Sequence, residues 1–197
     1  DNETTILLTW LAHTFPSERP IPRKCGKRRF PQVTVWAFVG MNIFYLHRDP
    51  VKAARYQYNK HVVKMILESA QMLCTAHHEI MGDDANVPYK RAHVNHPSTI
   101  WCRSSAENYI WLYDHFCALS DEYTKRYGKV HLSYTKCDEH LRYLPGGLPY
   151  TGFTQPPQCM PDEYKDPCSV KAYWNYYIAE KHIVAGKNEK IYEKINI

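Results

Sequence analysis

Apolar side chains recur with helical spacing in the stretch that follows Asp49 and Pro50. Their intervals fit the 3.6-residue period of an α-helix, so they would form one buried stripe. Its members are Ala54, Tyr58, Val62, Met65, Ile66, Met72 and Leu73. An aspartate can cap the first N–H groups of a helix, and proline suits the first turn because it has no N–H to leave unpaired. The pattern predicts one long helix that begins at Asp49 and ends by Gly82.

Two polar residues, His61 and Glu68, lie close to the same stripe. A separation of seven residues is about two helical turns, so the imidazole and the carboxylate share one face. A polar group on a core-facing stripe must be paired or must line a cleft. In one interpretation His61 is a satisfied core histidine and Glu68 pairs with Lys64. In the other, Glu68 is a general acid/base or electrostatic stabiliser and His61 orients a substrate. Both interpretations stay open here.

A second long helix is predicted from Ser104 to Tyr127. Ser104 and Glu107 have the spacing of a capping box, and Gly128 suits the residue after a helix end. The expected buried stripe is Ile110, Tyr113, Cys117, Leu119 or Ser120, and Tyr123.

Shorter elements complete the prediction. Residues 42–46 suit a strand or a buried extended segment, and residues 129–140 suit a further helical turn or two. Residues 144–161 are rich in proline and glycine and should be irregular, and a last helix should run from Asp166-Pro167 to near Gly186. We therefore expect a mainly α protein, with a compact single domain (42–197) around three long helices with irregular loops.

Residues 1–41 read as a basic, weakly structured N-terminal extension. The run from Arg23 to Arg29 is either a solvated tail or an arm that contacts phosphates. The extension carries +3 of the net charge of +5 of the 197 residues, which leaves +2 for the remainder. This nearly neutral body argues against tight nonspecific binding to DNA.

Seven cysteines without CxxC spacing predict free thiols in a reducing compartment. The sequence has no apolar run of membrane-spanning length and no secretory signal, so we expect a soluble cytoplasmic protein with no membrane partner. It also lacks the GxGxxG, P-loop and GxSxG motifs, and no cofactor is expected.

Several histidines with Glu79 suggest a metal site: His77, His78, His93 and His96. The ligand spacings of known zinc and ferritin-type sites are absent, so we expect no metal. His96-Pro97 instead suits a rigid entry to the second helix, at the rim of a cleft.

Aromatic residues and lysines alternate near the C-terminus. Tyr173 and Tyr177 are one helical turn apart and should belong to the core, which would point Trp174 and Tyr176 elsewhere. Rings interleaved with lysines such as Lys181 suit stacking on bases and contact with phosphates. A core with a lysine-decorated surface is the alternative.

Six segments resemble a group of small phage proteins: 41–50, 60–68, 95–98, 122–129, 160–165 and 173–181. More distantly, the chain is similar to the phage pyrimidine-dimer DNA glycosylases of the endonuclease-V type, which are small helical proteins that excise UV-damaged bases and nick the abasic site. In that family a helix carries a histidine and, seven residues later, the essential glutamate. His61 and Glu68 match this spacing. The family's middle helix resembles residues 96–129, and its aromatic C-terminal stretch resembles residues 173–177.

The resemblance implies a nucleophile at Asn42. In the family the α-amine of the residue after the initiator methionine attacks the sugar, and that residue would be Asn42. Here 41 residues precede it, and an amide nitrogen cannot form a Schiff base. Unless translation begins at Met41 or the leader is removed, Lys60, Lys64 or plain hydrolysis must replace the amine. The family's phosphate-binding arginines are also absent, since Leu67 precedes Glu68.

The leading hypothesis is a DNA-damage-directed N-glycosylase and abasic lyase that acts on pyrimidine lesions in double-stranded DNA. Glu68, His61 and Asn42 would be catalytic. DNA would contact Lys60, Lys64, His96, Trp174, Tyr176 and Lys181. One alternative is a non-catalytic phage accessory protein that binds nucleic acid or a host protein, and another is a small-metabolite enzyme that uses a His61/Glu68 cleft.

Overall fold

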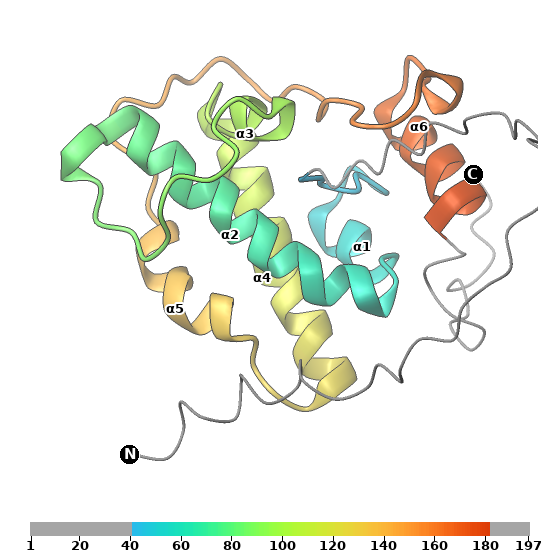
Figure 1. The fold of residues 1–197 in the computed structure, drawn as a ribbon, viewed down its shortest axis with the longest axis horizontal. Coiled ribbons are helices and arrows are strands. Elements are labelled where there is room, and N and C mark those ends of the chain that lie inside the picture. The colour runs from blue at the N-terminus through green and yellow to red at the C-terminus, as the bar shows by residue number, and fades with distance from the viewer. Residues whose placement is uncertain (1–40, 182–197) are drawn as a thin grey trace, which may run out of the picture. The chain divides into compact units, whose positions relative to one another are not determined.

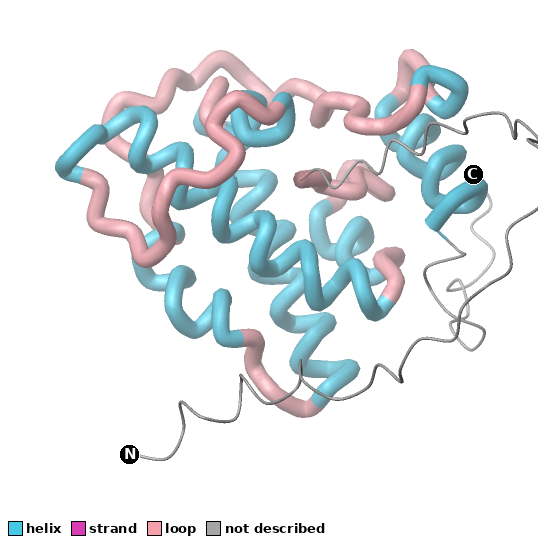
Figure 2. The backbone as a smooth tube through the Cα atoms, in the orientation of Figure 1, coloured by secondary structure: helices cyan, strands magenta, loops and turns pink. Residues whose placement is uncertain are grey.

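The computed structural model describes residues 41–181, and every regular element in this part of the chain is a helix (Figures 1 and 2). The predicted mainly α fold is therefore confirmed. The helices are α1 (Pro50–Arg55), α2 (Asn59–Met81), η1 (Gly82–Asp84), α3 (Pro97–Cys102), α4 (Ala106–Tyr127), α5 (Leu132–Leu141), η2 (Asp162–Tyr164), α6 (Ser169–Tyr176) and the π-helical turn η3 (Tyr177–Lys181). None of the helices in the described part is both long and apolar enough to cross a membrane. The predicted extension, except Met41, lies outside the described residues.

The two longest helices, α2 and α4, pack against each other and supply nearly half of the buried apolar side chains of the described residues (Figure 1). Helix α1 packs on α4, while α3 and α5 pack on α2. The fully buried side chains of α2 include Val62, Met65, Ile66, Met72 and Leu73, as the apolar spacing predicts. His61 and Glu68 are buried on the same helix, at 7% and 9% exposure.

The single helix predicted from Asp49 to Gly82 is wrong in one respect, because the chain breaks between α1 and α2. Asp49 caps α1 as expected, with its Oδ1 accepting the N–H of Val51 at 2.8 Å. At the break, Arg126 of α4 donates to the backbone carbonyls of Arg55 and Gln57 at 3.0 and 2.8 Å. These carbonyls lie at the end of α1, where backbone carbonyls have no N–H partner within the helix. A tertiary contact with Arg126 therefore stabilises the break.

The segment before α1 is buried but forms no strand. Its polar backbone groups find partners in side chains, as buried backbone groups require. Trp174 donates to the Leu46 carbonyl at 2.8 Å and Trp111 to the Arg48 carbonyl at 2.7 Å. Residues 42–46 were predicted to form a strand or a buried extended segment. The segment is buried, but it forms a turn and no strand.

Helix α4 begins one residue later than predicted. Ser105, not Ser104, is the N-cap, and its Oγ accepts the N–H of Asn108 at 3.1 Å. Glu107 completes no capping box and instead accepts the N–H of Gly152 at 3.0 Å. The predicted stripe is also misplaced by one position in part, since Ile110 is 43% exposed. The buried residues of α4 include Tyr109, Leu112, Phe116, Leu119 and Tyr123.

The C-terminal part follows the prediction more closely. Gly128 ends α4 in the left-handed conformation, with φ of 69°. Residues 144–160 contain no helix or strand, as expected from their prolines. The last helix begins at Ser169 rather than at Asp166, and its continuation toward Gly186 falls beyond the described residues after Lys181. Tyr173 and Tyr177 are buried in the core as predicted.

Candidate active site

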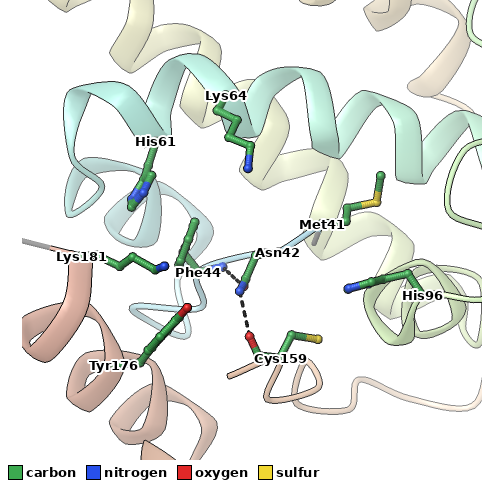
Figure 3. Close-up of a pocket in the computed structure, with 9 residues that line it drawn as sticks. All are labelled: Met41, Asn42, Phe44, His61, Lys64, His96, Cys159, Tyr176 and Lys181. Carbon is green, nitrogen blue, oxygen red and sulfur yellow. Dashed lines mark hydrogen bonds between the residues drawn. The ribbon is translucent and has the colours of Figure 1, made fainter. Parts of the chain in front are cut away.

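A small cavity of about 70 Å³ opens beside the turn that precedes α1 (Figure 3). Its walls come from that turn, from α2, from the start of α3, from the irregular loop before η2, and from α6 with η3. The lining residues are Met41, Asn42, Phe44, His61, Lys64, His96, Cys159, Tyr176 and Lys181.

The side chain of Asn42 builds the turn at the cavity. Its Oδ1 accepts the N–H groups of Ile43 and Phe44 at 2.7 and 3.1 Å, and its Nδ2 donates to the Cys159 carbonyl at 3.1 Å. Phe44 has a φ of 53°, a left-handed conformation that is strained for a residue with a bulky side chain. The two hydrogen bonds from the backbone hold the chain in this conformation, and they leave the backbone nitrogen of Asn42 to face α2.

Glu68 receives that backbone nitrogen. Its Oε2 accepts the N–H of Asn42 at 3.1 Å, and its Oε1 forms an ion pair with Lys64 Nζ at 2.9 Å. Both oxygens of the carboxylate are therefore occupied by donors. The side chain of Glu68 is 12% exposed, whereas that of Lys64 is 54% exposed. The pairing of Glu68 with Lys64 is thus present, together with a contact to Asn42 that helix spacing alone does not predict.

His61 is held by Tyr177 and Phe44. Its Nδ1 lies 2.7 Å from the hydroxyl of Tyr177, and its ring stacks on Phe44 with centroids 4.4 Å apart and an interplanar angle of 16°. Burial lowers the pKa of His61 to about 4, and the positive charges of Lys181 and Lys64 lower it further in the same direction. The imidazole is therefore neutral at pH 7.

The remaining polar walls are cationic or neutral. His96 is the N-cap of α3, where its Nδ1 accepts the N–H of Ser98 at 3.2 Å. Lys181 places its Nζ 4.5 Å from the centre of the Tyr176 ring. Cys159 Sγ lies 3.4 Å from Ser98 Oγ. A cavity with these walls suits an acceptor-rich or anionic ligand.

The structure brings together most of the residues that the sequence marks as candidates. The cavity is lined by Asn42, His61, Lys64, His96, Tyr176 and Lys181, and Glu68 contacts two of these residues (Figure 3). Lys60 is exposed and does not line it. The prediction that Trp174 and Tyr176 point away from the core is wrong, because they are only 6% and 4% exposed. Trp174 donates its indole N–H to the Leu46 carbonyl, whereas Tyr176 packs in the core and borders the cavity.

The sequence did not mark as site residues three that line the cavity, Met41, Phe44 and Cys159, nor Tyr177, the partner of His61. Phe44 was assigned only to an apolar segment, Cys159 to an irregular loop, and Tyr177 to the core without its contact to His61. Cys159 and Tyr177 lie more than 100 positions from their partners at the site, so no local pattern marks them. Within residues 41–181, no group of three or more His, Cys, Asp or Glu side chains is arranged to hold a metal ion.

Comparison with known proteins gives one result for this region. Residues 41–135 match the family model described as pyrimidine dimer DNA glycosylase. The matched part is just under half of the chain and contains Asn42, His61, Glu68 and His96, but not the C-terminal wall of the cavity. No curated protein and no solved structure matches the chain. The family match supports the resemblance stated above and a glycosylase kind of function, which implies a DNA substrate.

Proposed function

We propose that this protein is an N-glycosylase that removes pyrimidine lesions from double-stranded DNA and, when Asn42 carries a free amine, also an abasic lyase. The observation that supports this most is the 3.1 Å hydrogen bond to Glu68 from the backbone nitrogen of Asn42, which lines the cavity. The nucleophile and the essential glutamate implied by the family resemblance lie 26 positions apart in the sequence, yet they are in direct contact.

Base removal needs a negative charge beside the sugar. As the bond between C1′ and the base nitrogen breaks, its electron pair leaves with the base and positive charge develops at the sugar. The Glu68 carboxylate stabilises that charge, and it acts strongly because it is fixed and mostly shielded from water. The departing base takes up a proton from solvent. Because the target must leave the helical stack to reach a cavity, the DNA is opened at the lesion.

The lyase step depends on the chemical state of Asn42. A free amine at Asn42 attacks C1′, the base departs, and the sugar ring opens to an imine. Loss of a proton from C2′ then expels the 3′ phosphate and cuts the strand, and water releases the imine. In the 197-residue chain the Asn42 nitrogen is an amide bonded to Met41, which lacks the nucleophilic lone pair of an amine. That chain releases the base by addition of water to C1′ and does not cut the strand by this route.

Contact with DNA comes from the cationic walls. Lys64 and Lys181 line the cavity from α2 and η3, and the buried ring of Tyr176 supports Lys181. Lys60 lies one turn before Lys64 on the exposed face of α2 and extends the positive surface toward the flanking phosphates. Binding is expected to weaken as salt rises, because each phosphate contact releases counterions.

The test uses a duplex oligonucleotide that carries one thymine dimer. Base release is scored as an alkali-labile abasic site, because the cyclobutane ring of the dimer keeps the freed base attached to its neighbour. Base release, strand scission and trapping with borohydride are measured for the full chain, for a chain that begins at Asn42, and for Glu68→Gln in both. Glu79→Gln is the matched control, because Glu79 lies on the same helix but pairs with Arg91 at 3.0 Å outside the cavity.

We expect base release from both parent chains, and scission with trapping only from the chain that begins at Asn42. Glu68→Gln should abolish these activities and Glu79→Gln should retain them. Absence of base release from every chain would contradict the glycosylase proposal and favour an accessory or small-ligand function. Trapping by the full chain would assign the amine to a lysine such as Lys64.

A further inference from the structure

The contact between His61 and Tyr177 bears on which nitrogen of the imidazole carries its proton. Tyr177 receives the backbone N–H of Tyr58 at 2.8 Å, so one lone pair of its hydroxyl oxygen is already used. The same oxygen lies 2.7 Å from His61 Nδ1. Hydrogen bonds donated by hydroxyl groups are typically shorter than those donated by N–H groups, and this distance is the common one for hydroxyl donors but the short limit for N–H donors. The geometry favours Tyr177 as the donor and Nδ1 as the acceptor.

The other ring nitrogen then faces the ligand. Among the described residues, Nε2 of His61 has no hydrogen-bond partner. It is also not one of the fully buried polar atoms without a partner, so it is not completely enclosed. His61 lines the cavity, while the ring face is covered by Phe44. A neutral imidazole that accepts at Nδ1 carries its proton on Nε2.

His96 shows the same arrangement on another wall. Its Nδ1 accepts a backbone N–H, from Ser98 at 3.2 Å, and a backbone N–H can only donate. A neutral His96 therefore also carries its proton on Nε2. His131 repeats this pattern outside the cavity, with its Nδ1 accepting the N–H of Ser133 at 3.1 Å.

We propose that Tyr177 is a positioning residue that holds His61 in the neutral form protonated on Nε2, so that the cavity presents histidine hydrogen-bond donors, and not a histidine base, to its ligand. With Lys64 and Lys181 on the same cavity, the bound group is an oxygen acceptor, either a sugar oxygen or a phosphate oxygen. The identity of that group rests on the proposed function, whereas the protonation state of His61 does not.

The groups that face His61 are consistent with this state. Lys64 comes from its own helix and Lys181 from η3, and both oppose a positive charge on the imidazole. Tyr177 and Tyr58 pack against it from η3 and from the turn before α2, with ring centroids at 5.3 and 6.0 Å. Burial is the largest cause of the lowered pKa, so the ring stays neutral through the range in which ordinary histidines titrate.

The test is a long-range proton–nitrogen correlation spectrum of the full chain labelled with ¹⁵N. His61 signals are identified by their absence in His61→Gln, and His96 and His131 provide internal references for a proton on Nε2. We expect His61 to give one protonated, pyrrole-like nitrogen at Nε2 and one unprotonated, pyridine-like nitrogen at Nδ1 at pH 7. A proton on Nδ1, or two nitrogens with averaged shifts, would overturn the proposal.

The role of Tyr177 is tested with Tyr177→Phe, which keeps the ring stacked on Tyr58 but removes the hydroxyl. We expect the Nδ1 resonance of His61 to shift and the two nitrogens to move toward shared protonation. Tyr173→Phe is the matched control, because its hydroxyl donates to the Pro157 carbonyl at 2.7 Å and not to His61. Unchanged His61 signals in Tyr177→Phe would refute the positioning role, and the parent spectrum tests the protonation state even if that variant does not fold.

A final arm adds a duplex that contains a tetrahydrofuran analogue of an abasic site. We expect the Nε2 proton signal of His61 to shift on binding, as a donor that meets an oxygen acceptor should. Binding that leaves this signal in place would contradict the donor role. Absence of binding would count against the proposed function and would leave the assignment of the proton to be decided by the free protein.

Discussion

Glu68 and Glu122 are both buried glutamates, each 9% exposed, but their surroundings differ. The Oε2 of Glu122 accepts from Nε of Arg126 at 3.1 Å and forms an ion pair with its Nη2 at 3.1 Å, and the side chain of this arginine is itself only 9% exposed. Glu68 pairs with a lysine that is 54% exposed and with the backbone nitrogen of a residue that lines a cavity. One carboxylate is enclosed by the fold, while the other lies between the fold and a ligand space.

The comparison separates a structural ion pair from a candidate catalytic one. Arg126 also donates to the carbonyls of Arg55 and Gln57, so Glu122 and Arg126 together fix the break between α1 and α2. Burial and charge are therefore not sufficient to mark a site. Glu122 also lies 3.9 Å from the exposed side chains of Arg55 and Lys125, so the features that distinguish Glu68 are its contact with the Asn42 nitrogen and the neighbouring cavity.

Removing Arg126 should give the largest effect on stability. Arg126→Met leaves a buried carboxylate and two helix-terminal carbonyls without their partner, and loss of one member of a buried ion pair costs about 3–5 kcal/mol. Urea unfolding measures the change, and Lys125→Met is the control because that lysine is exposed and lies 3.9 Å from Glu122. A loss equal to that of the control would mean that the ion pair does not stabilise the break.

Acidification should lower stability through three buried histidines. Burial lowers the pKa of His61 and His77 to about 4 and that of His115 to about 3. As the pH falls below 6.5, the unfolded chain binds protons that the folded chain does not, so stability is lost from there down to the folded pKa values. Each group contributes about 1.4 kcal/mol per pH unit in that window.

Thermal unfolding between pH 7 and pH 5.5 tests this dependence above the range of ordinary carboxylates. We expect His115→Gln to reduce the dependence of stability on pH by the contribution of one histidine, since His115 lies in the core and not at the cavity. A stability that does not change over this range would show that the three histidines are not held neutral by burial.

Asn42 should matter for the shape of the cavity turn. Asn42→Ala leaves the N–H groups of Ile43 and Phe44 without their acceptor, and an unsatisfied buried donor costs about 1–3 kcal/mol. Asn42→Asp keeps the acceptor oxygen and should recover most of the loss. Urea unfolding of the two variants gives the comparison, and equal destabilisation would contradict the role of Oδ1.

Lys64 should have the smallest effect on stability. Its ion pair with Glu68 is half exposed, and such pairs contribute about 0.2–1 kcal/mol. We expect Lys64→Met to weaken binding to an abasic-site duplex more than binding to undamaged DNA, because Lys64 lines the cavity. Lys60→Met should weaken both equally. The measurement is affinity at several salt concentrations, and equal effects of the two variants would remove Lys64 from the site.

Local sequence patterns correctly predicted the features that depend on residues close together in the sequence. The cap at Asp49, the helix end at Gly128 and the shared face of His61 and Glu68 all follow from spacing within one helix. Distant contacts decided the rest. The break before α2 depends on Arg126, which lies 69 positions from Gln57. Burial of Trp174 depends on the Leu46 carbonyl, 128 positions away, and no helical period contains that information.

The most direct test of the account compares the two glutamates in one assay. Single-turnover base release from a thymine-dimer duplex is measured for Glu68→Gln and Glu122→Gln and corrected for the folded fraction of each. We expect Glu68→Gln to lose about 10²–10³-fold in rate, the cost of removing a fixed charge-stabilising group, while folded Glu122→Gln keeps the parent rate. Equal rates in the two variants, or a Glu68→Gln variant as active as the parent, would contradict a catalytic role for Glu68.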